Sequence, residues 1–248
     1  MVLNLIQVLV SHPLGDKEGF TINLTIRADG VKLPAEVIIK TAAKGGVLSE
    51  AYLAKLIIPD NIIVKSARKS WWNGVFDNGY IETVFQGNQD HTVLLRDSFA
   101  VHMTAESVEL LESKNVHQII IPPGMTGKWQ PLDVSVNKAF KDYFREQYKR
   151  WRTENIKFTH KGNIKKPGKQ EFINMVSVAW DKISEEVVRN SFYAAEILRK
   201  PQISVGETFE EDDNLLEVSF FSVTSFFGLE DNSNDSDGFG SGDEDGAA

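Results

Sequence analysis

The sequence predicts an α/β protein with a mixed β-sheet, flanking helices and an acidic C-terminal tail. Three observations support this. Alternating apolar residues on both sides of Asp29-Gly30 indicate a β-hairpin over Thr21–Lys40. Two strand-like runs, Thr92–Arg96 and His117–Ile121, enclose one short helical segment, which favours a parallel α/β unit. Beyond them, apolar residues recur at helical spacing as far as about Leu198.

The N-terminal half of the chain alternates expected strands with short expected helices. Met1–Val10 is apolar and is expected to form a strand before a loop. After the hairpin we expect a helix, a strand and a second helix, at Ser49–Leu56, Asn61–Lys65 and Asp77–Phe85. The helix between the two later strands is Ala105–Lys114, which Thr104 is placed to cap.

Three helices are expected in the C-terminal half. The first begins at Asp133, which stands where an N-cap belongs, and ends near Glu154. Its apolar residues recur every three or four positions: Val136, Phe140, Phe144, Tyr148 and Trp151. The second covers Gln170–Ile183, and Ser184 caps the third. A Lys- and Gly-rich loop, Phe158–Lys169, separates the first two.

Charge is segregated along the 248 residues, and it divides the chain into three expected parts. These are an N-terminal segment over 1–20, a domain over 21–200 and a low-complexity tail over 201–248, expected to be mostly disordered. The tail from Glu207 holds 13 acidic residues and no Lys or Arg, so residues 1–206 carry a net charge of +5. Within Lys138–Lys169 there are 11 basic and 3 acidic residues. A basic body of this kind attracts a polyanion, and an acidic tail competes with it.

Composition excludes several classes of protein. There are no cysteines, so structural disulfides and cysteine-based zinc sites are excluded. No apolar run is long enough to span a bilayer, and the N-terminus lacks the pattern of a secretory signal. We therefore expect an intracellular protein without a membrane partner.

Two carboxylates, Asp97 and Asp133, stand at the ends of two different elements. Metal-assisted phosphodiester chemistry requires carboxylates that converge from separate elements onto divalent cations. The alternative is structural: Asp97 caps the turn that follows its strand, and Asp133 caps its helix. Spacing alone leaves both interpretations open.

Several further residues are candidates for contacts with nucleic acid. His102, five residues after Asp97, is either a phosphate contact or a partner of that carboxylate. Trp71-Trp72 either stacks on bases or belongs to the core. The basic candidates lie mostly in the region of high positive charge, where aromatic residues are interleaved: Lys128, Lys138, Lys141, Arg145, Lys149, Arg150, Lys165 and Lys166. The alternative for these cations is an ordinary solvated helix face.

Two segments resemble the motifs of pogo/Tigger-like DDE transposases. Arg96–Thr104 (RDSFAVHMT) resembles the second-aspartate motif, and Pro122–Lys138, with its Gln-Pro-Leu-Asp, resembles the third. Ala28–Pro34 is similar to the hairpin of that domain, and Ala179–Ser184 with Ser191-Phe192 to its C-terminal helices.

The resemblance implies a fold, a chemistry and a location. The fold is ribonuclease H-like, the cofactor is Mg²⁺ or Mn²⁺, the partner is DNA and the compartment is the nucleus. Asp97 and Asp133 become the catalytic and metal-binding residues. The family's leading aspartate lies in an Asn-x-Asp-Glu-like motif on the first core strand, and we expect this strand and the N-terminal helix-turn-helix domains to be missing here. Met1–Val10, which contains no acid, is a candidate substitute strand.

Arg96 is a further departure, because the motif strand usually carries an aliphatic residue there. An arginine at this position either pairs with Asp97 or marks drift after selection was lost. With one of three carboxylates absent, we expect weak metal binding and little nuclease activity.

Three functions remain open from the sequence. The first is a DNA-binding, transposase-derived endonuclease domain with impaired catalysis. The second is a domesticated interaction or regulatory protein that uses the fold as a scaffold. Its tail would bind a protein partner through Phe220, Phe221, Phe226 and Phe227. The third is a gene product without a selected function. Oligomeric state and target DNA are not predicted.

Overall fold

The computed structural model describes residues 2–10, 18–87, 92–158, 160, 165–200 and 220–221. Most of the expected tail and part of the expected basic loop lie outside these residues. The expectation of disorder in the tail therefore remains a prediction.

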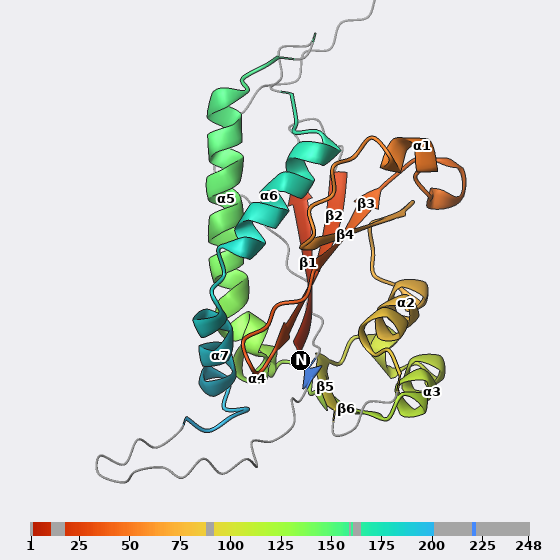
Figure 1. Cartoon of the computed structure of the whole chain (residues 1–248), viewed down its shortest axis with the longest axis vertical. Helices are drawn as coiled ribbons and strands as arrows, with labels where there is room; N and C mark the ends of the chain where they lie inside the picture. The colour runs from red at the N-terminus through yellow and green to blue at the C-terminus, as the bar shows by residue number, and fades with distance from the viewer. Residues whose placement is uncertain are drawn as a thin grey trace, which may run out of the picture.

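The structure contains one mixed sheet with the strand order β4-β3-β2-β1-β5-β6 (Figure 1). The pairs β1–β2 and β2–β3 are antiparallel, whereas the pairs β3–β4, β1–β5 and β5–β6 are parallel. A short seventh strand pairs with β2. This is the ribonuclease H-like mixed sheet that the resemblance implies. The strands are β1 (Val2–Val10), β2 (Glu18–Arg27), β3 (Ala35–Lys40), β4 (Ile62–Ala67), β5 (Thr92–Asp97), β6 (Val116–Ile121) and β7 (Phe220–Phe221).

A strand fills the central place where the first core strand was expected to be missing. β1 pairs with β2 along its whole length, and Val2 pairs with Leu95 of β5. The segment Val2–Val10 thus lies between β2 and β5 in the sheet, and its role as a substitute for the family's first core strand stays a prediction. It brings no carboxylate with it, because this segment contains no Asp or Glu.

The predicted hairpin is present as β2 and β3, with Phe20 paired to Ile39. The turn requires a glycine at position 30, where φ is 101° and a Cβ would meet the Arg189 side chain. The polar face of β2 is buried as well as the apolar face, and on it Asn23 Nδ2 donates to Glu36 Oε2 at 2.8 Å. Both faces of the sheet are therefore covered, which is characteristic of α/β folds.

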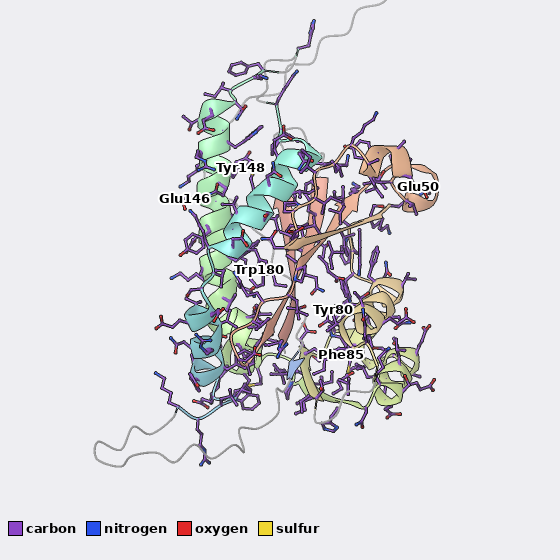
Figure 2. All side chains as sticks on the ribbon, viewed as in Figure 1. Glu50, Tyr80, Phe85, Glu146, Tyr148 and Trp180 are labelled. Carbon is purple, nitrogen blue, oxygen red and sulfur yellow. The ribbon has the colours of Figure 1, made fainter. Side chains whose placement is uncertain are left out.

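Helices cover the sheet on two sides and enclose two apolar clusters (Figure 2). Trp180 lies on the side of α5 and α6, whereas Tyr80 and Phe85 lie on the side of α2. The helices are η1 (Lys44–Gly46), α1 (Glu50–Leu53), α2 (Gly74–Val84), η2 (Ala100–Met103), α3 (Ala105–Ser113), α4 (Thr126–Trp129), η3 (Leu132–Val136), α5 (Asn137–Glu154), α6 (Lys169–Asp181) and α7 (Glu185–Ala194).

Local sequence signals account for two helix starts and one buried helix face. Thr104 Oγ1 accepts a hydrogen bond from Ser107 N, and Ser184 Oγ accepts one from Val187 N, so both predicted caps are confirmed. Phe140 and Phe144 of α5 are buried as their spacing predicts. The helix predicted to start at Asp133 instead opens with a π-helical turn, η3, before α5 begins.

Candidate functional site

Asp97 is the last residue of β5 and is nearly buried, with 9% of its surface exposed. Its Oδ1 accepts a hydrogen bond from Phe99 N at 3.1 Å and lies 3.1 Å from His102 Nδ1. The first contact confirms that Asp97 caps the turn after its strand. The second joins it to a buried network.

His102, in η2, is fully buried between two carboxylates. Its Nδ1 faces Asp97 and its Nε2 lies 3.5 Å from Asp77 Oδ1. A buried ring is not on the surface that a DNA phosphate would touch. The geometry thus favours the other interpretation from the sequence, a partner of Asp97.

Arg96 forms its ion pair with Asp77 of α2. Its Nη1 lies 3.0 Å from Asp77 Oδ2, and both side chains are fully buried. Pairing with Asp97 was one of two interpretations left open by the sequence, and the ion pair is formed with Asp77 instead, because neighbouring residues of a strand point to opposite faces of the sheet. Burial lowers the pKa of the Arg96 guanidinium, and the charge of Asp77 opposes that shift.

Asp77 is the centre of this network, and the sequence did not identify it as a site residue. It also accepts hydrogen bonds from Trp72 Nε1 at 3.0 Å and Ser107 Oγ at 2.7 Å. Arg96 Nη2 donates to Gln118 Oε1 at 2.6 Å and to the His102 carbonyl at 3.1 Å. The available signal was the arginine inside an apolar strand, since a buried arginine needs an acidic partner.

Asp133 lies in the first turn of η3, and the N-cap position belongs to Pro131. The expected N-cap role is therefore wrong. Asp133 Oδ1 accepts a hydrogen bond from Asn137 Nδ2 at 2.7 Å, one helical turn later. A further turn along is Lys141, whose pKa is lowered by burial, while the nearby charge of Asp133 raises it.

The residues present do not fit a two-metal site. Within the part of the chain that the structure describes, no three His, Cys, Asp or Glu side chains are grouped to hold a metal ion. Asp97 already serves a turn and a histidine, and Asp133 already serves Asn137. Strand transfer requires both metal ions to be held by convergent carboxylates, so we derive no catalytic step through them.

Five of the eight predicted basic residues lie in α5, and the other three lie outside it. Lys138, Arg145, Lys149 and Arg150 are exposed, and Lys141 is half-buried. Arg145 is paired with Asp142 at 2.9 Å. Outside α5, Lys165 is exposed, Lys166 is half-buried and Lys128 is exposed, 3.8 Å from Glu196.

The tryptophan pair divides between the two interpretations. Trp72 is buried and donates to Asp77, so it belongs to the core. Trp71 is 54% exposed, so it is not part of the core, and its interpretation as a base-stacking residue stays a prediction.

The sequence profile of the DDE superfamily endonucleases matches residues 17–192, most of the chain. This chain belongs to the DDE superfamily endonucleases. It is 31% identical over 217 residues to the human "Pogo transposable element with KRAB domain" and 29% identical to the mouse protein of that name. Both alignments cover 85% of this chain but 33% of the relative, so the chain spans a third of the length of these relatives.

Among solved structures, a chain from the simian T-cell lymphotropic virus intasome in complex with PP2A regulatory subunit B56 gamma is similar. The TM-score is 0.34 at 6% identity, over 85% of this chain and 58% of that chain. In the described residues, no helix is long and apolar enough to cross a membrane.

Proposed function

We propose that this chain is a DNA-binding, transposase-derived domain of the pogo/Tigger type whose catalysis is impaired, and that it acts in the nucleus. Family membership provides the context. The observation that carries the proposal is the exposed basic face of α5. The observation that limits it is the incomplete set of carboxylates around Asp97 and Asp133.

The basic face of α5 consists of Lys138, Arg145, Lys149 and Arg152, all exposed. Their spacing of seven, four and three residues places them on one side of the helix. At about 1.5 Å per residue they extend over roughly 21 Å, long enough to follow several phosphates of one DNA backbone. Arg152 is an addition to the residues that the sequence predicted.

Binding through this face should depend strongly on salt. If each of the four cations neutralises one phosphate, log K should fall with log salt at a slope of about −3.6. A variant with all four changed to Gln should lose most of that slope. The matched control changes Lys40, Lys55, Arg68 and Lys69 to Gln, which removes the same charge from exposed positions elsewhere. The measurement is fluorescence anisotropy with a labelled duplex over a salt series.

Equal losses in the basic-face variant and the control would show that binding follows net charge alone, and the proposed interface would then be rejected. Loss confined to the basic-face variant supports it. A fluorescent fusion in cells tests the nuclear location.

Impaired catalysis is tested separately. We expect little nicking of supercoiled DNA with Mg²⁺ or Mn²⁺, because two aspartates leave the metal ions under-coordinated. Nicking that disappears in both Asp97→Ala and Asp133→Ala would contradict this part of the proposal and leave the DNA interface untouched.

A second candidate function is an interaction or regulatory protein in which the tail is the active segment. It is favoured by the pairing of Phe220 and Phe221 with Arg27 and Ile26 of β2. This pairing supports a tail segment that can add to a sheet. Under this alternative, residues 1–206 would show no steep salt-dependent DNA binding, and the same anisotropy series separates the two functions.

A further inference from the structure

The connection after α5 exposes two apolar side chains that are separated by one residue in sequence. α5 ends at Glu154, where the Asn155 backbone N–H and Nδ2 both donate to the Trp151 carbonyl, at 2.9 and 3.1 Å. Beyond this cap, Ile156 is 55% exposed and Phe158 is 59% exposed, with the exposed Lys157 between them. The helix end is thus fixed, and an aromatic ring projects just past it.

A backbone hydrogen bond holds the base of this connection together. Lys165 N donates to the Lys157 carbonyl at 2.7 Å, which places Lys165 beside the segment that carries Phe158. Both lysines are exposed. We call Ile156–Phe158 together with Lys165 and Lys166 the α5 tip.

The connection that carries the α5 tip is basic, with Glu154 and Glu171 just outside it. Between Asn155 and Gln170 the sequence has five lysines and no acidic residue. The tip also continues the basic face of α5, since Arg152 and Lys149 lie one to two turns before it. In Figure 1 this end of α5 lies at the opposite end of the molecule from β5 and β6, and so away from Asp97.

Exposed aromatic and cationic groups together fit one kind of ligand better than others. An apolar protein surface would cover Phe158 but leave the ammonium groups unpaired, whereas a nucleotide offers a base for the ring and a phosphate for each lysine. A base is available for stacking where it is unpaired, so a single strand suits the tip better than an intact duplex.

We infer that the α5 tip is a single-strand contact: Phe158 stacks on an unpaired base while Lys157 and Lys165 bind the flanking phosphates. This rests on the proposed DNA binding and adds a preference to it. The basic face of α5 binds backbone in either form of DNA, and the tip adds affinity only where bases are free.

The test compares three substitutions at Phe158 in the full chain. Phe158→Tyr keeps the ring, Phe158→Leu keeps the apolar volume without the ring, and Phe158→Ala removes both. Anisotropy is measured with a labelled oligo(dT) and with a duplex of the same length. Leu and Ala should weaken oligo(dT) binding about tenfold and duplex binding far less, and Tyr should resemble the wild type. Quenching of 2-aminopurine in the single strand should be kept by Tyr and lost with Leu.

Val75→Ala is the control, because it removes an exposed apolar side chain from another element, α2. If Phe158→Leu binds oligo(dT) as well as the wild type, the inference is overturned while the proposed function stands. An equal loss in Val75→Ala also overturns it, because the effect would not be local. If the wild type binds neither DNA, the proposed function itself fails. A dimer in light scattering that Phe158→Ala abolishes would make a second copy the occupant and reject the inference.

Discussion

Asp97 and Asp133 each accept a hydrogen bond at Oδ1, but from different kinds of partner. Both contacts described for Asp97 involve Oδ1, so Oδ2 is the oxygen that can accept another donor or a cation. Asp133 Oδ1 accepts from Asn137, and Lys141 contributes a neighbouring positive charge. Asp97 thus belongs to the turn and the histidine at the end of β5, and Asp133 belongs to the polar contacts of its own helix.

The Arg96–Asp77 pair should be important for stability, because both groups are fully buried. Arg96→Ala or Asp77→Ala should each lower the free energy of unfolding by about 3–5 kcal/mol, since each leaves an unpaired buried charge. The double replacement Arg96→Ala with Asp77→Ala should be less destabilising than the sum of the single changes, because it removes both members of the pair. Urea denaturation of all variants gives the double-mutant cycle.

The control cycle uses Arg145 and Asp142, a pair at a similar distance of 2.9 Å with both side chains at least half exposed. It should show a coupling below about 1 kcal/mol. Coupling between Arg96 and Asp77 no larger than in this control would show that the buried pair does not act as a unit.

Lys32 should make stability depend on pH in the alkaline range. Its Nζ donates to the carbonyls of Trp180 and Ile183 at the end of α6, and burial lowers its pKa below the ordinary 10.5, against the opposing charges of Asp181 and Glu185. The unfolded chain therefore binds more protons between the folded pKa and 10.5, so the free energy of unfolding should rise with pH there. Lys32→Met should lack this rise, measured by urea denaturation from pH 7.5 to 10.

A wild type and a Lys32→Met protein with parallel pH profiles would contradict this assignment. Lys182→Met serves as the comparison, because Lys182 is more exposed and pairs with Glu146 on the surface.

At the scale of elements, the sequence predicted what local patterns encode and missed what long-range contacts create. The β2–β3 hairpin follows from alternation around Asp29-Gly30, and α6 follows from helical spacing. The network around Asp77 joins this residue to Arg96 and Ser107, 19 and 30 positions away, and no local pattern specifies such pairs. The sequence did not predict the π-helical turn at Asp133, because an aspartate is acceptable both at the N-cap and in the first turn of a helix.

The register of β1 predicts where a third carboxylate would restore metal binding. Val2 is paired in parallel with Leu95, so two residues further along, Asn4 is level with Asp97. Asn4→Asp should therefore raise Mn²⁺ affinity, measured by electron paramagnetic resonance and calorimetry. Leu3→Asp is the control, because alternate strand positions face opposite sides of a sheet.

Equal Mn²⁺ binding by Asn4→Asp and Leu3→Asp would show a non-specific charge effect and contradict the register. The gain should also disappear in Asn4→Asp combined with Asp97→Asn.

The pairing of β7 with β2 can be trapped directly, because the chain has no cysteine of its own. Arg27 and Phe220 are antiparallel partners, at a separation that suits a disulfide. Arg27→Cys with Phe220→Cys should form an intramolecular disulfide under mild oxidation, seen as a mobility shift on non-reducing gels. Arg27→Cys with Phe226→Cys is the comparison. A disulfide-linked dimer as the main product would show exchange of the tail between copies.

At the scale of the whole molecule, the segregation of charge is the dominant feature. The family domain carries the basic face of α5, while every charged residue from Glu207 onward is acidic. β7 brings one point of that tail against the end of β2. This contact tethers the tail to the domain. Its negative charge can therefore interact with the basic body of the same protein over distances comparable to the Debye length.

We expect the tail to compete with DNA for the basic body. Removing residues 207–248 should strengthen duplex binding about fivefold at 50 mM salt and much less at 300 mM, because screening weakens the tail's repulsion. A full-length variant with the 13 acidic tail residues changed to Asn or Gln separates charge from chain length and should match the truncation. Unchanged affinity at low salt in both proteins would contradict the competition. If the truncation strengthens binding but the neutralised full-length variant does not, the effect comes from the bulk of the tail. Electrostatic competition with phosphates requires the tail's negative charge, which the neutralised variant lacks.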